Sequence, residues 1–179
     1  MKEFSRFFNI PETQAKEVKS VDDFISQFGG RQFNDGLFRV FKFEDLEMWQ
    51  NNVESAFTNF KGKFKLFAFD WLGRCFGVDL RKNTFGNILM FEIGTNDVLE
   101  IPCQFFEFLN EEIPQYHDEC LASSFYNEWK NSLGKSITYS ECVGYKVPLF
   151  LNGIDNIDNL EVSDMDVYWH IFSQIISQL

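Results

Sequence analysis

The sequence predicts an α+β fold, in which helices pack on a central, mainly antiparallel sheet and an amphipathic helix ends the chain. Short runs rich in β-branched and aromatic residues follow one another through turn-like links, and short links favour antiparallel neighbours because parallel pairing needs a long crossover. The chain also holds 23 phenylalanines among 179 residues, which supply enough apolar surface for a well-formed core.

The first third of the chain predicts two helices and one strand. In SVDDFISQFGG, Ser20 is a candidate N-cap, Asp23 takes the capping-box position and Gly29 marks the stop. GLFRVF, residues 36–41, predicts a strand, and residues 44–57 predict a helix with one apolar side. That side is formed by Leu46, Trp49, Val53, Ala56 and Phe57.

The centre of the chain predicts a β-meander. Its connections WLG, LRKNTFG and GTND are all turn-like, so successive strands are expected to be neighbours rather than parts of a doubly wound sheet. The expected strands are residues 63–70, 74–79, 87–93 and 98–102.

The next segment predicts a return to helices and then one strand. Residues 103–112 and 117–134 read as two helices on either side of Pro114. GYKVPLFL, residues 144–151, predicts a strand whose Pro148 indicates an edge or a bulge, and NGIDNID reads as a loop.

The C-terminal helix has the clearest pattern. Ser163 is the expected cap, Asp166 closes a capping box, and an apolar stripe at helical spacing is expected to face the core. The stripe consists of Tyr168, Ile171, Phe172, Ile175, Ile176 and Leu179.

Charge is distributed very unevenly along this acidic chain. Residues 1–82 carry 13 Lys and Arg against 12 Asp and Glu, whereas residues 83–179 carry 3 against 15. The second half therefore repels nucleic acid and anionic lipid and attracts basic partners. A solvated surface that only keeps the protein soluble explains the same charge.

The four cysteines predict buried, reduced thiols in a cytoplasmic protein. Cys75 lies in the strand-like GRCFG, without the helix N-terminus or paired histidine that activates a nucleophilic thiol, so we expect a structural role. Asp70 and Arg74 are expected to pair across the WLG turn. No CxxC spacing occurs, and no run of 18 apolar residues indicates a membrane span. The N-terminus lacks the features of a signal peptide.

The sequence contains no recognised catalytic, metal or cofactor motif. The phosphate-binding glycine loops, GxSxG and HExxH are absent, and the acid-rich run 155–166 departs from the EF-hand order at Ile157 and has no glycine at its sixth position. The sequence therefore predicts no catalytic residue, no metal ligand and no cofactor.

Three stretches resemble one bacterial family. They are FDWLGRCFGVD (residues 69–79), VLEIPCQFFEFLNEE (98–112) and CVGYKVPLFLNGIDNIDNLEVSDMDVYWHIFSQI (142–175). The family joins an N-terminal GAD-like domain to a C-terminal domain typical of immunity proteins of type VI secretion DNase effectors. The resemblance implies a GAD-like region at 1–82 and an immunity-protein-like region at 83–179, packed as one unit.

The resemblance also implies a function without catalysis. A cytoplasmic immunity protein binds and blocks the toxic domain of a cognate effector, here expected to be a basic nuclease, and needs no direct contact with nucleic acid or membrane. A general protein-interaction module, or a hydrolase without a recognised motif, remain the alternatives.

Exposed loop acids of the second half are the expected partner contacts. We predict that some of the contacts come from a pool of nine acids, Asp97, Glu100, Glu111, Glu112, Asp118, Glu119, Asp155, Asp158 and Glu161.

Overall fold

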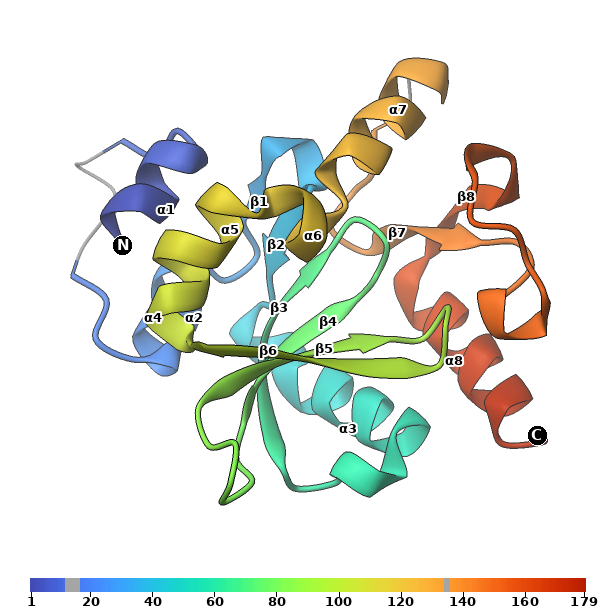
Figure 1. Cartoon of the computed structure of the whole chain (residues 1–179), viewed down its shortest axis with the longest axis horizontal. Coiled ribbons are helices and arrows are strands. Elements are labelled where there is room, and N and C mark those ends of the chain that lie inside the picture. The colour runs from blue at the N-terminus through green and yellow to red at the C-terminus, as the bar shows by residue number, and fades with distance from the viewer. Residues whose placement is uncertain (12–16, 134–135) are drawn as a thin grey trace.

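The computed structural model describes residues 1–11, 17–133 and 136–179. Within them, six strands form one antiparallel meander in which each strand pairs with the next along the chain (Figure 1). The strands are β1 (Gln32–Phe33), β2 (Phe38–Val40), β3 (Phe64–Asp70), β4 (Cys75–Asp79), β5 (Asn87–Glu92) and β6 (Asp97–Gln104). The α+β fold class is confirmed, and the four central strands lie where the sequence predicts them.

Helices cover both faces of this sheet. The first face carries α1 (Lys2–Phe7), α2 (Val21–Phe28), α4 (Phe105–Glu107), α5 (Ile113–Gln115), α6 (His117–Leu121) and α7 (Ser123–Leu133). The second face carries α3 (Leu46–Ala56) and α8 (Met165–Ile176). Figure 1 shows α5–α7 above the sheet and α3 below it. Two hydrophobic cores result, one on each face.

Strand β3 supplies side chains to both cores because of a bulge. Its register with β4 shifts between Leu66 and Ala68, which places Phe67 and Ala68 in the first core and Leu66 and Phe69 in the second. Without the bulge, side chains would alternate strictly between the faces. Phenylalanine rings on β3 therefore anchor helices on both sides of the sheet.

The two predicted N-terminal helices are confirmed. The Asp23 N–H donates to Ser20 Oγ at 3.1 Å, and α2 ends at Gly29. Helix α3 begins at Leu46 after a 3-10 turn and buries Trp49 and Val53 against the second face.

The helical segment after β6 differs from the prediction in two ways. Pro114 lies inside a continuous helical stretch rather than between two helices, since residues 108–112 form a wider π-helical turn before it. The helix expected at 117–134 is broken at Ala122, whose φ of 49° is left-handed. The last residue of that expected helix, at 134, lies outside the described residues.

The C-terminal ribbon also corrects the sequence interpretation. The strand expected at 144–151 lies at β7 (Glu141–Tyr145), and residues 149–151 form a 3-10 turn. Its partner β8 (Leu160–Asp164) follows the expected NGIDNID loop and was not among the predicted strands, since Glu161, Ser163 and Asp164 leave only two apolar residues in it.

Helix α8 starts one residue later than expected and presents a different side. Asp164, not Ser163, accepts the Val167 N–H at 3.0 Å, while Asp166 accepts a hydrogen bond from Asn52. The buried residues are Met165, Tyr168, Trp169 and Phe172, so the expected stripe is wrong at Ile171 and Leu179, which are exposed. Trp169 lies about one position around the helix from the predicted stripe.

Candidate functional site

The WLG turn between β3 and β4 is the structural centre of the molecule rather than an active site. Asp70 Oδ2 lies 2.6 Å from Arg74 Nε, and both side chains are buried, which confirms the predicted pair. Although burial alone would lower it, the Asp70 carboxylate raises the pKa of the Arg74 guanidinium, so Arg74 stays charged. Gly73 has a φ of 78°, and an added Cβ would lie 3.1 Å from that of Cys142.

Elements from both halves of the chain meet this turn. The Trp71 indole N–H donates to Leu121 O on α6, and the Trp169 indole N–H donates to Gly73 O from α8. The Val143 N–H of β7 donates to Trp71 O at 2.7 Å. The turn therefore joins both helical layers and the ribbon through satisfied, buried polar groups.

Cys75 is fully buried in β4, and burial raises the pKa of its thiol well above the ordinary value. His117 contacts Ser123 and Phe7, and His170 contacts Gln174. The other three cysteines are also buried and free. These surroundings match the expected structural role of Cys75.

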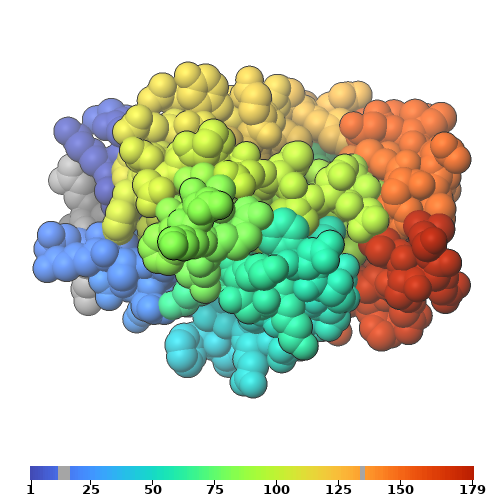
Figure 2. All heavy atoms as spheres, turned by 60° about the horizontal axis from the view of Figure 1, so that its bottom comes forward, coloured from blue at the N-terminus to red at the C-terminus, as the bar shows by residue number. Residues whose placement is uncertain are grey.

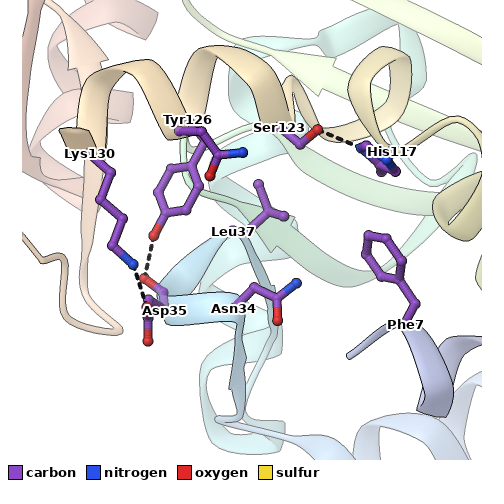
Figure 3. A pocket seen from close by; sticks show the side chains of 9 residues that line it. Phe7, Asn34, Asp35, Leu37, His117, Ser123, Tyr126 and Lys130 are labelled. Atoms are coloured by element: carbon purple, nitrogen blue, oxygen red, sulfur yellow. Dashed lines mark hydrogen bonds and ion pairs between the residues drawn. The ribbon is translucent and has the colours of Figure 1, made fainter. Parts of the chain in front are cut away.

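A pocket of about 370 Å3 lies between α1, the turn after β1 and α6–α7 (Figure 3). Tyr126 donates to the Asp35 carbonyl at 2.7 Å, and Lys130 pairs with the Asp35 carboxylate. These contacts fix the turn against α7. The lining residues are Phe7, Asn34, Asp35, Leu37, His117, Ser123, Tyr126, Asn127 and Lys130.

The pocket is lined by His117 and Ser123, and Asp118 lies beside them, but the three are not in the order that catalysis needs. His117 Nδ1 lies 2.6 Å from Ser123 Oγ, whereas Asp118 accepts from the Ser124 N–H at 2.7 Å and lies 3.4 Å from Ser123 Oγ. In a serine hydrolase the carboxylate orients the histidine. Here it completes the N-terminus of α7, and the Ser124 N–H lowers the pKa of Asp118.

The predicted acids fall into separate places on the surface. Asp118 lies beside the pocket, next to His117 and Ser123, and Asp158 and Glu161 are exposed at the ribbon. Glu100 lies on the second face of the sheet, where Arg81 and Asn87 hold its carboxylate at 3.0 Å each. The remaining five acids, Asp97, Glu111, Glu112, Glu119 and Asp155, lie around the first face at the β6 side of the sheet.

Several of these acids lie close enough to Cys103 and Cys120 to raise the pKa of their thiols. Burial raises the pKa of Cys103 to about 12, with Glu112, Glu107 and Glu111 adding to the rise. Burial raises the pKa of Cys120 to about 12 as well, and Glu112 and Glu119 again contribute. The negative surface beside β6 therefore has two parts, the acids of α4–α6 around Cys103 and Cys120, and Asp97 and Asp155 around Glu92.

The sequence interpretation missed two acids of this surface, Glu92 and Glu107. Glu92 sits at the end of a strand-like run, and its pairing with Asp97 across the hairpin could have indicated it. We name this surface the acidic edge, defined by the backbone of β6 together with the side chains of Glu92, Asp97, Glu107, Glu111, Glu112, Glu119 and Asp155.

The acidic edge also exposes apolar and backbone surface. Leu99 of β6 is 49% exposed and Tyr116, beside α6, is 50% exposed. Figure 2 shows the yellow-green atoms around β6 at the surface, between the yellow helices and the blue-green α3 segment. Exposed aromatic and aliphatic groups within a charged rim are typical of protein interfaces.

Replacing Glu92 with glutamine is expected to stabilise the free protein at neutral pH. Burial raises the pKa of Glu92; Arg74 opposes the rise, and Asp70, Asp155 and Asp97 add to it. A carboxyl whose pKa is raised in the fold binds more protons there, so stability falls as pH rises from its unfolded pKa through its folded pKa. Glutamine does not ionise and avoids this cost.

Urea unfolding at about pH 4 and about pH 7 tests this expectation. Glu92→Gln should gain over the wild type at the higher pH and lose that gain at the lower one. The variant Asp158→Asn, at an exposed acid, controls for the loss of one charge. An equal difference at both values would contradict the assignment.

Within the described part of the chain, no three His, Cys, Asp or Glu side chains gather as a metal site would require. No helix there is long and apolar enough to cross a membrane, since α8, the longest, has 12 residues.

Comparison with known proteins relates the C-terminal part of this chain to one family and its fold to one solved structure. A search of curated proteins returns no match. The crystal structure of Atu4351 from Agrobacterium tumefaciens superposes with a TM-score of 0.58 at 17% identity, over 97% of this chain and 80% of that one, which shows a shared fold. Residues 103–176 match the family model described as T6SS immunity protein Tdi1, C-terminal. The segment from the end of β6 through α8 is therefore similar to the C-terminal part of type VI secretion immunity proteins.

Proposed function

We propose that this chain is a non-catalytic immunity protein, which binds and neutralises the toxic domain of a type VI secretion effector. The family match over residues 103–176 is the observation that carries the proposal. The matched segment includes α4–α6, which supply four of the seven acids of the acidic edge. The proposal extends to residues 1–82 as a GAD-like region, to 83–179 as the immunity region, and to a site of action in the cytoplasm.

The acidic edge favours a basic toxin, and among toxins a nuclease. A nuclease holds phosphates with Lys and Arg side chains, so a negative partner surface gains both association rate and affinity against it. Residues 83–129 contain nine acids and no Lys or Arg, so few positive charges of this chain compete with a basic partner for these acids. The partner is a protein, and the proposal requires no contact of this chain with nucleic acid or membrane.

Co-expression tests the proposal directly. The product of the adjacent gene is produced in a bacterial host with and without this chain, and survival and DNA integrity are compared. Rescue, with recovery of a stoichiometric complex, is expected. If the adjacent gene's product is harmless, or if this chain leaves its toxicity unchanged, a general protein-interaction module becomes the better interpretation.

The hydrolase alternative has one observation in its favour, the contact between His117 and Ser123 in the pocket. Ser123→Ala separates the two functions, because it removes the hydroxyl while leaving the acidic edge intact. Protection against the toxin is expected to persist in this variant. Loss of protection with binding retained would favour chemistry at the pocket.

Charge reversal on the acidic edge is expected to slow association by about tenfold at low salt. We choose Glu111→Lys with Glu119→Lys, since both acids are exposed, whereas Glu112 is half-buried. Opposite charge raises the encounter rate, and salt screens it over about 10 Å. Stopped-flow measurement of the association rate against ionic strength provides the test.

The matched control is Glu44→Lys with Glu47→Lys, which changes the net charge equally around the start of α3 on the second face. The two double variants should differ strongly at low salt and converge at high salt. Equal rates would show that net charge, rather than the acidic edge, steers the partner.

A further inference from the structure

Strand β6 is the open edge of the sheet. It is the longest strand in the described part of the chain, with eight residues, whereas β1 at the opposite edge has two. Five of its residues, Asp97, Leu99, Glu100, Pro102 and Gln104, are exposed. Natural sheets blunt such edges or use them for pairing with another chain.

The ladder register shows which backbone groups of β6 are unpaired. The Asp70 N–H donates to Arg74 O and the Gly86 N–H donates to Asp79 O, so even-numbered residues of β4 bond toward β3 and odd-numbered residues toward β5. The regular pairing of β4 with β5 carries this alternation onward. Odd-numbered residues of β5 therefore bond to β4, and even-numbered residues bond to β6.

Pairs Met90–Leu99 and Glu92–Asp97 consequently exchange hydrogen bonds across β5 and β6. The residues between them, Val98 and Glu100, direct their N–H and C=O groups outward. Among the described residues, none bonds to these four groups. Pro102 follows them, but it lies beyond the regular register.

The side chains around this edge define what it accepts. The Glu100 carboxylate is drawn onto the second face by Arg81 and Asn87, so it leaves the strand backbone uncovered. The first face presents the acids of the acidic edge, and the Arg74 guanidinium there is buried and bonded to Asp70. A second copy of this chain would bring a like-charged edge against it, which is unfavourable.

We propose that an extended, Lys- or Arg-rich segment of the toxin pairs with β6 as a seventh strand, through the backbone of Val98 and Glu100. This inference rests on the proposed immunity function and names the contact by which it operates. Main-chain hydrogen bonds supply affinity in such strand addition, and side chains alternating along the added strand supply specificity. Basic side chains of the added strand meet the carboxylates of the acidic edge, and apolar ones meet Leu99.

Residue-resolved amide hydrogen exchange by NMR tests the pairing. In the free protein, the Val98 and Glu100 amides should exchange fast, while pairing with β5 should protect those of Leu99 and Ile101. In the complex with the adjacent gene's product, the Val98 and Glu100 amides should become protected by about tenfold or more. A stable complex in which both amides still exchange fast would overturn the inference while leaving the immunity function intact.

Two substitutions at one position separate backbone pairing from side-chain contact. Glu100→Ala and Glu100→Pro both remove the carboxylate, but only proline removes the outward N–H. An edge strand tolerates this proline, because the lost N–H makes no hydrogen bond to β5. Glu100→Pro should bind at least about tenfold more weakly than Glu100→Ala. Equal affinities of the two folded variants would contradict strand addition.

Two other results have defined meanings. Protection of Val98 and Glu100 in the free protein that grows with its concentration would assign the edge to a second copy of this chain and overturn the inference. Absence of any complex with the adjacent gene's product would instead remove the immunity function on which the inference rests. If Glu100→Pro fails to fold, the exchange measurement on the wild type decides.

Discussion

Arg39→Leu is expected to destabilise the protein by about 4 kcal/mol or more, because it leaves one buried and two partly buried carbonyl groups without their hydrogen-bond donor. Arg39 lies on β2 and is fully buried. Its Nη2 donates to Asp70 O at 2.6 Å, and its Nη1 donates to Thr138 O at 3.1 Å and to Glu141 O. Burial lowers the pKa of this guanidinium to about 10, which still leaves it charged at neutral pH.

The same side chain links distant parts of the chain. Its carbonyl partners Thr138 and Glu141 lie just before β7 and at its first residue, so Arg39 ties the start of the ribbon to the WLG turn. The guanidinium also lies 4.4 Å from the centre of the Phe69 ring. Arg39→Lys keeps the charge but offers one nitrogen instead of a planar fork, so an intermediate loss is expected. Urea unfolding ranks the variants.

Lys61→Leu, at an exposed surface position, is the control and should change the stability by less than about 0.5 kcal/mol. If Arg39→Leu unfolds at the same urea concentration as this control, the carbonyl contacts of Arg39 do not hold the ribbon to the sheet.

Asp70→Asn is the second substitution with a large expected effect, a loss of about 3–5 kcal/mol. Asp70 Oδ1 accepts the N–H groups of Leu72 and Arg74 at 3.0 and 2.9 Å, and Oδ2 accepts Arg74 Nε. An asparagine amide places a donor against that guanidinium, which then remains buried without a counter-charge. Chemical denaturation followed by tryptophan fluorescence reports the loss, since Trp71 lies in the same turn.

An exposed ion pair provides the matched comparison. Asp22 is 70% exposed and contacts Lys65 at 2.6 Å, so Asp22→Asn should cost less than about 1 kcal/mol. In a double-mutant cycle, Arg74→Met should cost less in the Asp70→Asn background than alone, because the stranded charge is gone. Additive costs would show that the two side chains do not act as a pair.

Local patterns were sufficient for the elements whose partners are adjacent in sequence. Strands β3 to β6 form a meander joined by short turns, so their alternation and their links indicate both position and neighbour. Helix α2 was predicted equally well, since its caps, Ser20 and Gly29, hydrogen-bond to backbone groups only a few residues away. The pairing of Asp70 with Arg74 spans four residues and was predicted for the same reason.

Elements whose conformation depends on distant contacts were read less well. β8 is a strand because Leu160–Asp164 pair with β7, and its five residues are too few for a strand prediction from their own pattern. Helix α8 turns Trp169 inward because its indole N–H meets Gly73 O, and Ile171 is left in solvent. The distant partner that decides each conformation cannot be read from the local spacing of apolar residues.

The charge asymmetry and the absence of a catalytic motif were properties of the sequence alone, and they limited the functional classes before any fold was known. Only the tertiary structure decided which acids share a surface, because strand pairing and helix packing bring Glu92, Glu112 and Asp155 to one side of β6 while they send Glu100 to the other. Composition fixes how much charge a chain carries, whereas long-range pairing determines where that charge meets solvent.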